Sequence, residues 1–256
     1  MKNILKSLLI FSLFIACSKG DDTFNSGSTS IADYPYLQQV GYSANDILSN
    51  NTFSTIYIEV MYVNGFAPTD NTLNNFKNFI EQRTYKTNVI VEKKEITPPV
   101  QTTYSIDDIR TIEDDNRTHF SANNQIALSA IFINGASANN TSDSYVLGTA
   151  YRNTSFVIFE ESVQSFSDSQ FEPSREVLES TVVLHEFGHL LGLVNVGTTM
   201  VTDHQDTANG AHCTDQNCLM YYKAENGSSI GNMVSGGQIP QLDSFCLEDL
   251  KANGGR

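Results

Sequence analysis

The sequence contains no tryptophan and few cationic side chains. Its 15 Lys and Arg stand against 29 Asp and Glu, which gives a formal net charge of −14. Because nucleic acids are bound through basic surfaces, this charge argues against a nucleic acid partner. The missing tryptophan is offset by 15 Phe and 11 Tyr, and hydrophobic residues make up 40% of the 256 residues. Such a composition is typical of a chain that folds around a hydrophobic core as one domain.

The N-terminus lacks an apolar run long enough to span a membrane. The run from Leu8 to Ala16 covers roughly nine residues, whereas a membrane helix needs about 20, and two lysines precede it. This pattern predicts a signal peptide over residues 1–16. The small Ala16 directly before Cys17 resembles a bacterial lipobox. The resemblance implies cleavage before Cys17 and a lipid that ties the chain to a membrane.

The segment after this cysteine has few apolar residues to bury. Residues 17–34 are rich in Ser, Thr, Asp, Gly and Asn, so we expect a flexible tether. Within it, Ser18–Asp22 is similar to the acidic segment of surface lipoproteins in Bacteroidetes-type bacteria. The similarity implies an extracytoplasmic, lipid-anchored protein at the outer membrane or cell surface. A single domain would then occupy residues 35–256.

Alternating strands and helices are expected across the first part of this domain. Four segments have the β-branched, aromatic and apolar composition of buried strands: 55–63, 89–91, 125–133 and 156–159. Helices are expected over 69–84 and 105–117. This order predicts a mixed, mostly parallel sheet in an upper α/β subdomain of about 50–192. Because Gly, Asn, Ser and Thr dominate afterwards, a loop-rich lower subdomain of about 193–256 completes an α+β fold.

The longest predicted helix runs from Pro173 to Gly192 and contains the motif H-E-x-x-H. His185 and His189 are four residues apart, so both imidazoles project from one helix face and can bind one zinc ion. Glu186 is the expected general base and acid, taking a proton from the water that zinc activates. A carboxylate on an otherwise apolar helix is costly without such a role. The motif therefore predicts a catalytic zinc centre.

The segment from His185 to Gly192 resembles the metzincin motif H-E-x-x-H-x-x-G-x-x-H. The resemblance implies a zincin fold, one catalytic Zn²⁺ and peptide bond hydrolysis. Where metzincins carry a third histidine this chain has Asn195, so the third ligand has to come from further along. His212 is the expected ligand and His204 is its rival.

The residues after His212 favour that choice. His212 is followed at once by Cys213, then by the spacing C-x4-C and by Met220, a pattern similar to the archaemetzincin branch of the family. The resemblance implies that Met220 forms the turn beneath the metal. Tyr222 stands where some metzincins place a tyrosine that assists the oxyanion, and its alternative role is packing. The strand at Ser155–Glu160 resembles the edge strand that pairs with an extended substrate.

Three cysteines remain once Cys17 is set aside. In archaemetzincins the C-x4-C pair joins a later C-x-x-C to bind a second, structural zinc. Here Cys246 is followed by Asp249 where the second cysteine of that later pair would stand. A disulfide with one free thiol and a second zinc site both remain open for Cys213, Cys218 and Cys246.

Taken together, these patterns predict a monomeric zinc endopeptidase that acts on extracytoplasmic proteins or peptides. No segment resembling a cysteine-switch propeptide precedes the domain, so latency of that kind is not expected. The alternatives are a binding lipoprotein with a degenerate metal site, and hydrolysis of a non-peptide amide or a glycan-linked substrate. Activity on a generic protein substrate separates the first alternative from the leading hypothesis.

Overall fold

The computed structural model describes residues 34–98, 100–234 and 236–256. The expected signal peptide, Cys17 and residues 17–33 of the expected tether lie outside this described part of the chain. Among the described residues, no helix combines the length and the apolar character that crossing a bilayer requires.

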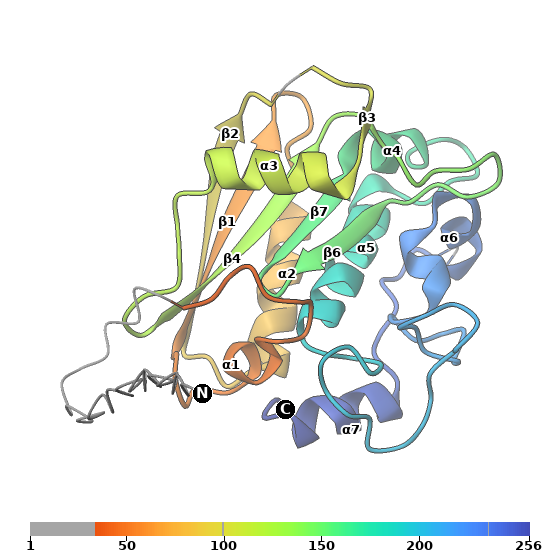
Figure 1. Ribbon diagram of the computed structural model, residues 1–256. Helices are drawn as coiled ribbons and strands as arrows, with labels where there is room; N and C mark the ends of the chain where they lie inside the picture. The colour runs from red at the N-terminus through yellow and green to blue at the C-terminus, as the bar shows by residue number, and fades with distance from the viewer. Residues whose placement is uncertain (1–33, 99, 235) are drawn as a thin grey trace, which may run out of the picture.

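A five-stranded mixed sheet forms the centre of the molecule (Figure 1). Four strands run parallel in the order β2-β1-β4-β7, and β6 closes one edge antiparallel to β7. This architecture confirms the predicted mixed, mostly parallel sheet. The strands are β1 Thr55–Val63, β2 Asn88–Ile96, β4 Gln125–Ile133, β6 Gly148–Arg152 and β7 Ser155–Phe159.

One strand prediction is wrong. Ser155–Glu160 was expected at the sheet edge, but β7 lies between β4 and β6, so its backbone is already paired on both sides. All five residues of β7 are buried, as an interior strand requires. The edge position belongs to Gly148–Arg152.

Helices cover both faces of the sheet. Figure 1 shows α3 (Ile106–Asn116) on one face and α2 (Asp70–Arg83) with α5 (Arg175–Leu190) on the other. Because successive side chains of a strand point to opposite faces of the sheet, one strand contributes residues to both cores. Val60 belongs to the core cluster beneath α2 and α5, whereas its neighbour Met61 belongs to the cluster beneath α3.

Polar side chains begin the three long helices. Thr69, Ser105 and Ser174 each accept a hydrogen bond from a backbone N–H of the first turn of α2, α3 and α5. Such caps satisfy amides that have no partner within the helix. In α5 every side chain from Leu178 to Leu190 is buried, which agrees with its apolar residues on more than one face. The helix that carries the motif is therefore held rigidly.

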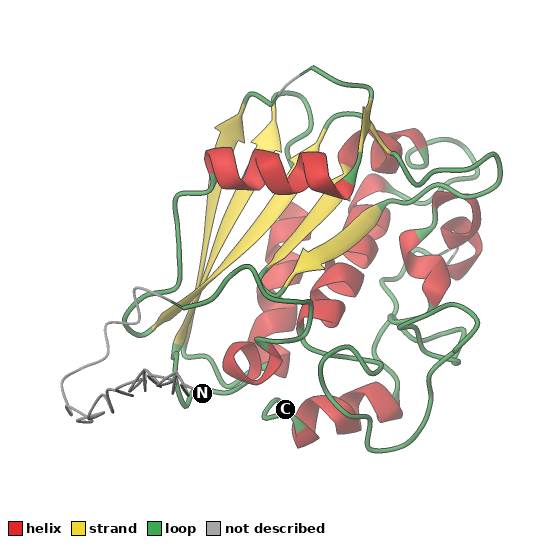
Figure 2. Cartoon of the chain, viewed as in Figure 1, coloured by secondary structure: helices red, strands yellow, loops and turns green. Residues whose placement is uncertain are grey.

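The chain after α5 is mostly loop, as expected (Figure 2). It contains a 3-10 helix η2 (Tyr222–Glu225) and the helices α6 (Gly227–Met233) and α7 (Ser244–Ala252). Elsewhere the short elements are α1 (Ala44–Leu48), β3 (Thr103–Tyr104), β5 (Ala136–Ser137) and α4 (Glu160–Ser165).

Candidate metal centre

Three of the chain's histidines meet at the C-terminal half of α5. His185 and His189 lie on this helix, and His212 comes from the following loop. Their ring centroids are 4.8 to 5.3 Å apart, and the Nε2 atoms of His185 and His189 are separated by 3.2 Å. All three rings are buried.

Backbone carbonyls fix the orientation of two of these rings. Nδ1 of His185 is 2.7 Å from the carbonyl oxygen of Leu219, and Nδ1 of His212 is 2.6 Å from that of Asn209. A carbonyl only accepts, so Nδ1 carries the proton in both rings and Nε2 presents a lone pair. The buried Nε2 of His212 has no hydrogen-bond partner. Converging ring nitrogens, two of them on rings oriented by a backbone carbonyl, are the kind of donor set that zinc requires.

The surroundings keep the rings of His185 and His189 neutral. Burial holds the pKa of His185 well below its usual range, and the neighbouring rings of His189 and His212 add to the effect. Burial, with His212 beside it, lowers the pKa of His189 to about 3. Neutral imidazole is the form that binds a metal ion.

Glu186 links the helix to the edge strand β6. Its Oε2 accepts a hydrogen bond of 2.7 Å from the Ala150 N–H, while the buried Oε1 has no hydrogen-bond partner. Burial raises the pKa of this carboxyl well above its usual range, and the negative charge of Glu225 raises it further. A carboxylate with one oxygen fixed and the other free can exchange a proton with a molecule bound in the cavity.

Gly148 allows the Glu186 side chain to lie close to the edge strand β6. A Cβ at Gly148 of β6 would come within 2.7 Å of the Glu186 Cγ and within 2.8 Å of its Oε1. A larger residue would therefore separate the strand from the carboxylate.

Asn195, at the position of the family's third histidine, and His204, the rival of His212, both lie away from the helix histidines. Asn195 has a left-handed backbone with φ 64°, and its side-chain amide donates to Gln205. His204 is buried, but it faces Cys213 and Asp249 instead of the helix histidines. Its partners belong to a second cluster. Tyr222 lines a cavity of about 260 Å³ together with His212 and Glu225.

This second cluster gathers sulfur and nitrogen donors. His204 Nδ1 lies 3.3 Å from Cys213 Sγ, and Cys218 Sγ lies 3.6 Å from Cys246 Sγ. All three thiols are free and buried. Hydrogen bonds from the other two thiols lower the pKa of Cys218 to about 4. Potential ligand atoms of His204, Cys213, Asp243 and Cys246 all lie within 4.8 Å of one another.

Asp249, which stands where the second cysteine of the later pair would be, contacts His204 and the backbone. Its Oδ2 is 2.9 Å from Nε2 of His204, and its Oδ1 accepts from the Val201 N–H. Burial would lower the pKa of His204, but the hydrogen bonds to Asp249 and Cys213 outweigh it and raise the pKa. Asp249 thus orients the imidazole whose other nitrogen faces the thiols.

A known structure has the same architecture. The crystal structure of archaemetzincin from Methanopyrus kandleri superimposes with a TM-score of 0.52 at 18% sequence identity, covering 78% of this chain and 96% of that one. The fold is that of an archaemetzincin. No protein-family model matches the sequence, and no curated protein matches it. At this identity the likeness establishes the archaemetzincin fold and leaves the chemistry to the residues themselves.

A cavity opens directly onto the histidines. It has a volume of about 240 Å³ and is lined by apolar residues of the edge strand and loops next to Glu186, His189 and His212. Glu225 completes the wall, and its carboxylate lies among the histidine nitrogens. Glu225 was not predicted from the sequence, because no spacing rule connects it with the helix.

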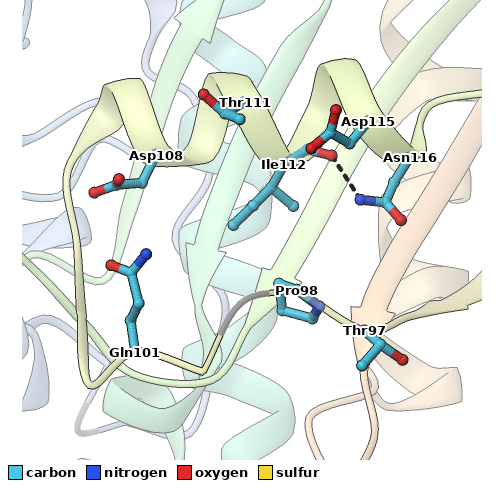
Figure 3. A pocket seen from close by; sticks show the side chains of 8 residues that line it. All are labelled: Thr97, Pro98, Gln101, Asp108, Thr111, Ile112, Asp115 and Asn116. Carbon is cyan, nitrogen blue, oxygen red and sulfur yellow. Dashed lines mark hydrogen bonds between the residues drawn. The ribbon is translucent and has the colours of Figure 1, made fainter.

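A third cavity, away from the histidines, has no comparable chemistry. It measures about 300 Å³ and lies between α3 and the segment after β2 (Figure 3). Its polar groups serve the helix itself: Asp108 pairs with Ser105 at the cap, and Asn116 donates to the Ile112 carbonyl (Figure 3). The histidine centre is therefore the better candidate for catalysis.

Proposed function

We propose that this protein is a zinc-dependent endopeptidase in which His185, His189 and His212 hold the metal. The observation that carries the proposal is the convergence of three buried imidazoles next to a carboxylate whose second oxygen is free. The archaemetzincin-like fold supports it.

The chemistry follows from the groups that face the cavity. A bound zinc ion would polarise the scissile carbonyl and lower the pKa of a water molecule to about 7. Glu186 takes a proton from the attacking water on its free oxygen and passes it to the leaving amine. The Ala150 N–H holds the other carboxylate oxygen, so the side chain keeps one orientation through both transfers.

The edge strand suggests how a peptide is held. β6 pairs with β7 on one side only, and Thr149 and Ala150 line the cavity beside Glu186. An extended peptide that adds to the free side of β6 gains main-chain hydrogen bonds and lies along the metal centre. We therefore propose proteins or peptides as the substrate class, with β6 in the place first given to Ser155–Glu160.

We infer that the second cluster binds a structural metal through His204, Cys213 and Cys246, whose ligand atoms converge, and through Cys218, whose thiol interacts with both other thiols. Three thiols and one imidazole are a common zinc donor set, and Asp249 supplies the outer hydrogen bond that such an imidazole needs. His204 would then belong to this site, which leaves His212 for the catalytic one. On the N-terminal sequence we further propose that a lipid on Cys17 anchors a monomer outside the cytoplasm.

The test is metal removal and restoration on the purified protein. A chelator should abolish cleavage of a casein-like protein, and zinc should restore it. A peptide panel and a panel of modified sugars are assayed in parallel. If the folded protein binds no zinc, the proposal fails and a binding lipoprotein is the better description. Zinc binding with turnover of sugar amides alone would assign another substrate class.

A further inference from the structure

Glu225 is a second carboxylate at the candidate metal centre, contributed by η2. Its Oε1 lies 3.4 Å from Nε2 of His212, and its Oε2 lies 3.8 Å from Nε2 of His185. Potential ligand atoms of Glu225 and of the three histidines all lie within 4.8 Å of one another. The carboxylate thus takes part in the same convergence as the imidazoles.

These separations match those between ligands of a single ion. Donor atoms about 2.0–2.1 Å from a tetrahedral zinc lie about 3.3 Å from one another. The 3.2 Å between the two helix histidines and the 3.4 Å between His212 and Glu225 are both close to this value. A fourth corner of the tetrahedron is therefore available to Glu225.

The backbone around Glu225 is clamped to the segment before β6. The Glu225 carbonyl accepts from the Leu147 N–H at 2.9 Å, and the Gly227 N–H donates to the Tyr145 carbonyl at 2.8 Å. The side chain is not sealed in, because about 30% of its surface is exposed. It lines both cavities that adjoin His212. A molecule entering either cavity therefore meets this carboxylate.

The two carboxylates at the centre differ in their contacts. Glu186 has one oxygen fixed by the Ala150 N–H of the edge strand, which suits proton transfer. The Glu225 carboxylate lies next to the Glu186 carboxyl and faces the ring nitrogens of His185 and His212. Glu225 is therefore the group placed to bind the metal.

We propose that Glu225 is the fourth protein ligand of the metal in the resting enzyme and that the substrate carbonyl or water has to displace it. Structural zinc sites have four protein ligands, whereas catalytic sites keep one position open. With Glu225 bound, the centre is closed. Its release opens the position that hydrolysis needs, so the device is a latch within the catalytic domain. This inference rests on the proposed zinc centre.

The first test is metal affinity, measured by competition with a chromophoric chelator. Glu225→Ala and the isosteric Glu225→Gln are compared with the parent, with His212→Ala as a reference for losing a ligand. Glu81→Gln, a charge-matched change at an exposed residue of α2, is the control. Loss of outer-shell partners typically weakens metal binding by 10–100-fold, so loss of a direct ligand should exceed about 100-fold in Glu225→Ala.

The second test asks whether the fourth position is blocked. The protein is loaded with cobalt(II) and titrated with acetohydroxamate, while the visible absorption of the cobalt ion is followed. In the parent the hydroxamate has to displace Glu225. Binding to cobalt-loaded Glu225→Ala should therefore be at least about tenfold tighter than to the parent and to Glu81→Gln.

The outcomes separate this inference from the proposed function. One outcome overturns only the latch. In it the parent binds metal and His212→Ala loses it, but both Glu225 variants keep the parental affinities for metal and hydroxamate. Glu225 is then not a ligand. If the parent binds no metal, the centre itself fails. Weaker metal binding with tighter hydroxamate binding in Glu225→Gln supports the latch even where Glu225→Ala does not fold.

Discussion

Gly188 of α5 and Met220 of the following loop are so close that a Cβ on the glycine would overlap with the methionine sulfur. His185 and His189 lie on either side of this glycine in the sequence of the helix. The loop is tied to the same place, because the carbonyl of Leu219 holds Nδ1 of His185. The glycine thus lets the loop pass directly beneath the metal centre.

Gly188→Ala should therefore disturb both stability and metal binding. Overpacking of a buried contact typically costs about 1–3 kcal/mol. We expect a loss of that size in urea unfolding, together with weaker zinc binding as the loop moves away from His185. Gly231→Ala in α6 is the control, since a Cβ there meets nothing within 4 Å. Parental stability and zinc affinity in Gly188→Ala would contradict the close approach.

Gly148 has a comparable relation to the Glu186 carboxylate. An alanine there would collide with the side chain of Glu186 and with Val182. We expect Gly148→Ala to retain its metal, because no histidine contact changes, but to lose at least about tenfold in kcat through the misplaced base. Metal content and steady-state kinetics on one preparation measure this. Loss of metal, or unchanged kcat, would show that Gly148 does not position Glu186.

The two rival histidines should be distinguishable by metal content. Each of His212→Ala and His204→Ala is expected to lose about one zinc per chain, since each ring belongs to a separate cluster. Only His212→Ala should abolish peptide hydrolysis outright. Elemental analysis and proteolysis on matched samples give the answer. If His204→Ala is inactive but keeps the metal of the second cluster, His204 and not His212 is the third ligand of the catalytic metal.

The core beneath α3 offers a prediction about stability alone. Glu113 is fully buried between Arg117, at 2.7 Å, and Arg152, at 2.9 Å. Removing one partner of such a group leaves an uncompensated charge, so Glu113→Ala should cost about 3–5 kcal/mol. Asp107→Ala breaks an exposed pair with Arg110 and should cost at most about 1 kcal/mol. Equal losses in chemical denaturation would show that the buried cluster is not stabilising.

The sequence was sufficient for most of the long, regular elements, although β2 (Asn88–Ile96) was expected only over 89–91. The bounds of β1 and β4 agree with prediction because continuous apolar runs mark strands buried on both faces. The H-E-x-x-H helix was equally clear. β6 was missed because Gly148–Arg152 is short and lacks such a run, and its pairing with β7 depends on tertiary contacts. The edge strand was therefore assigned to the wrong segment.

The loop-borne parts of the site required the three-dimensional structure. His204 and His212 are eight residues apart in a segment without periodicity, so sequence spacing does not determine which of them reaches the helix. Glu225 and Asp249 are ordinary acidic residues in the sequence. Their roles arise from contacts with His212 and His204 made by folding of the lower part of the chain.

The most direct test of the central claim compares the parent with Glu186→Gln, measuring zinc and protein cleavage on the same samples. The amide keeps the shape of the side chain but cannot take up the proton. We expect both proteins to bind the same amount of zinc and only the parent to cleave. Equal cleavage by the two would contradict the assignment of Glu186, and absence of zinc from a well-folded parent would contradict the metallopeptidase account altogether.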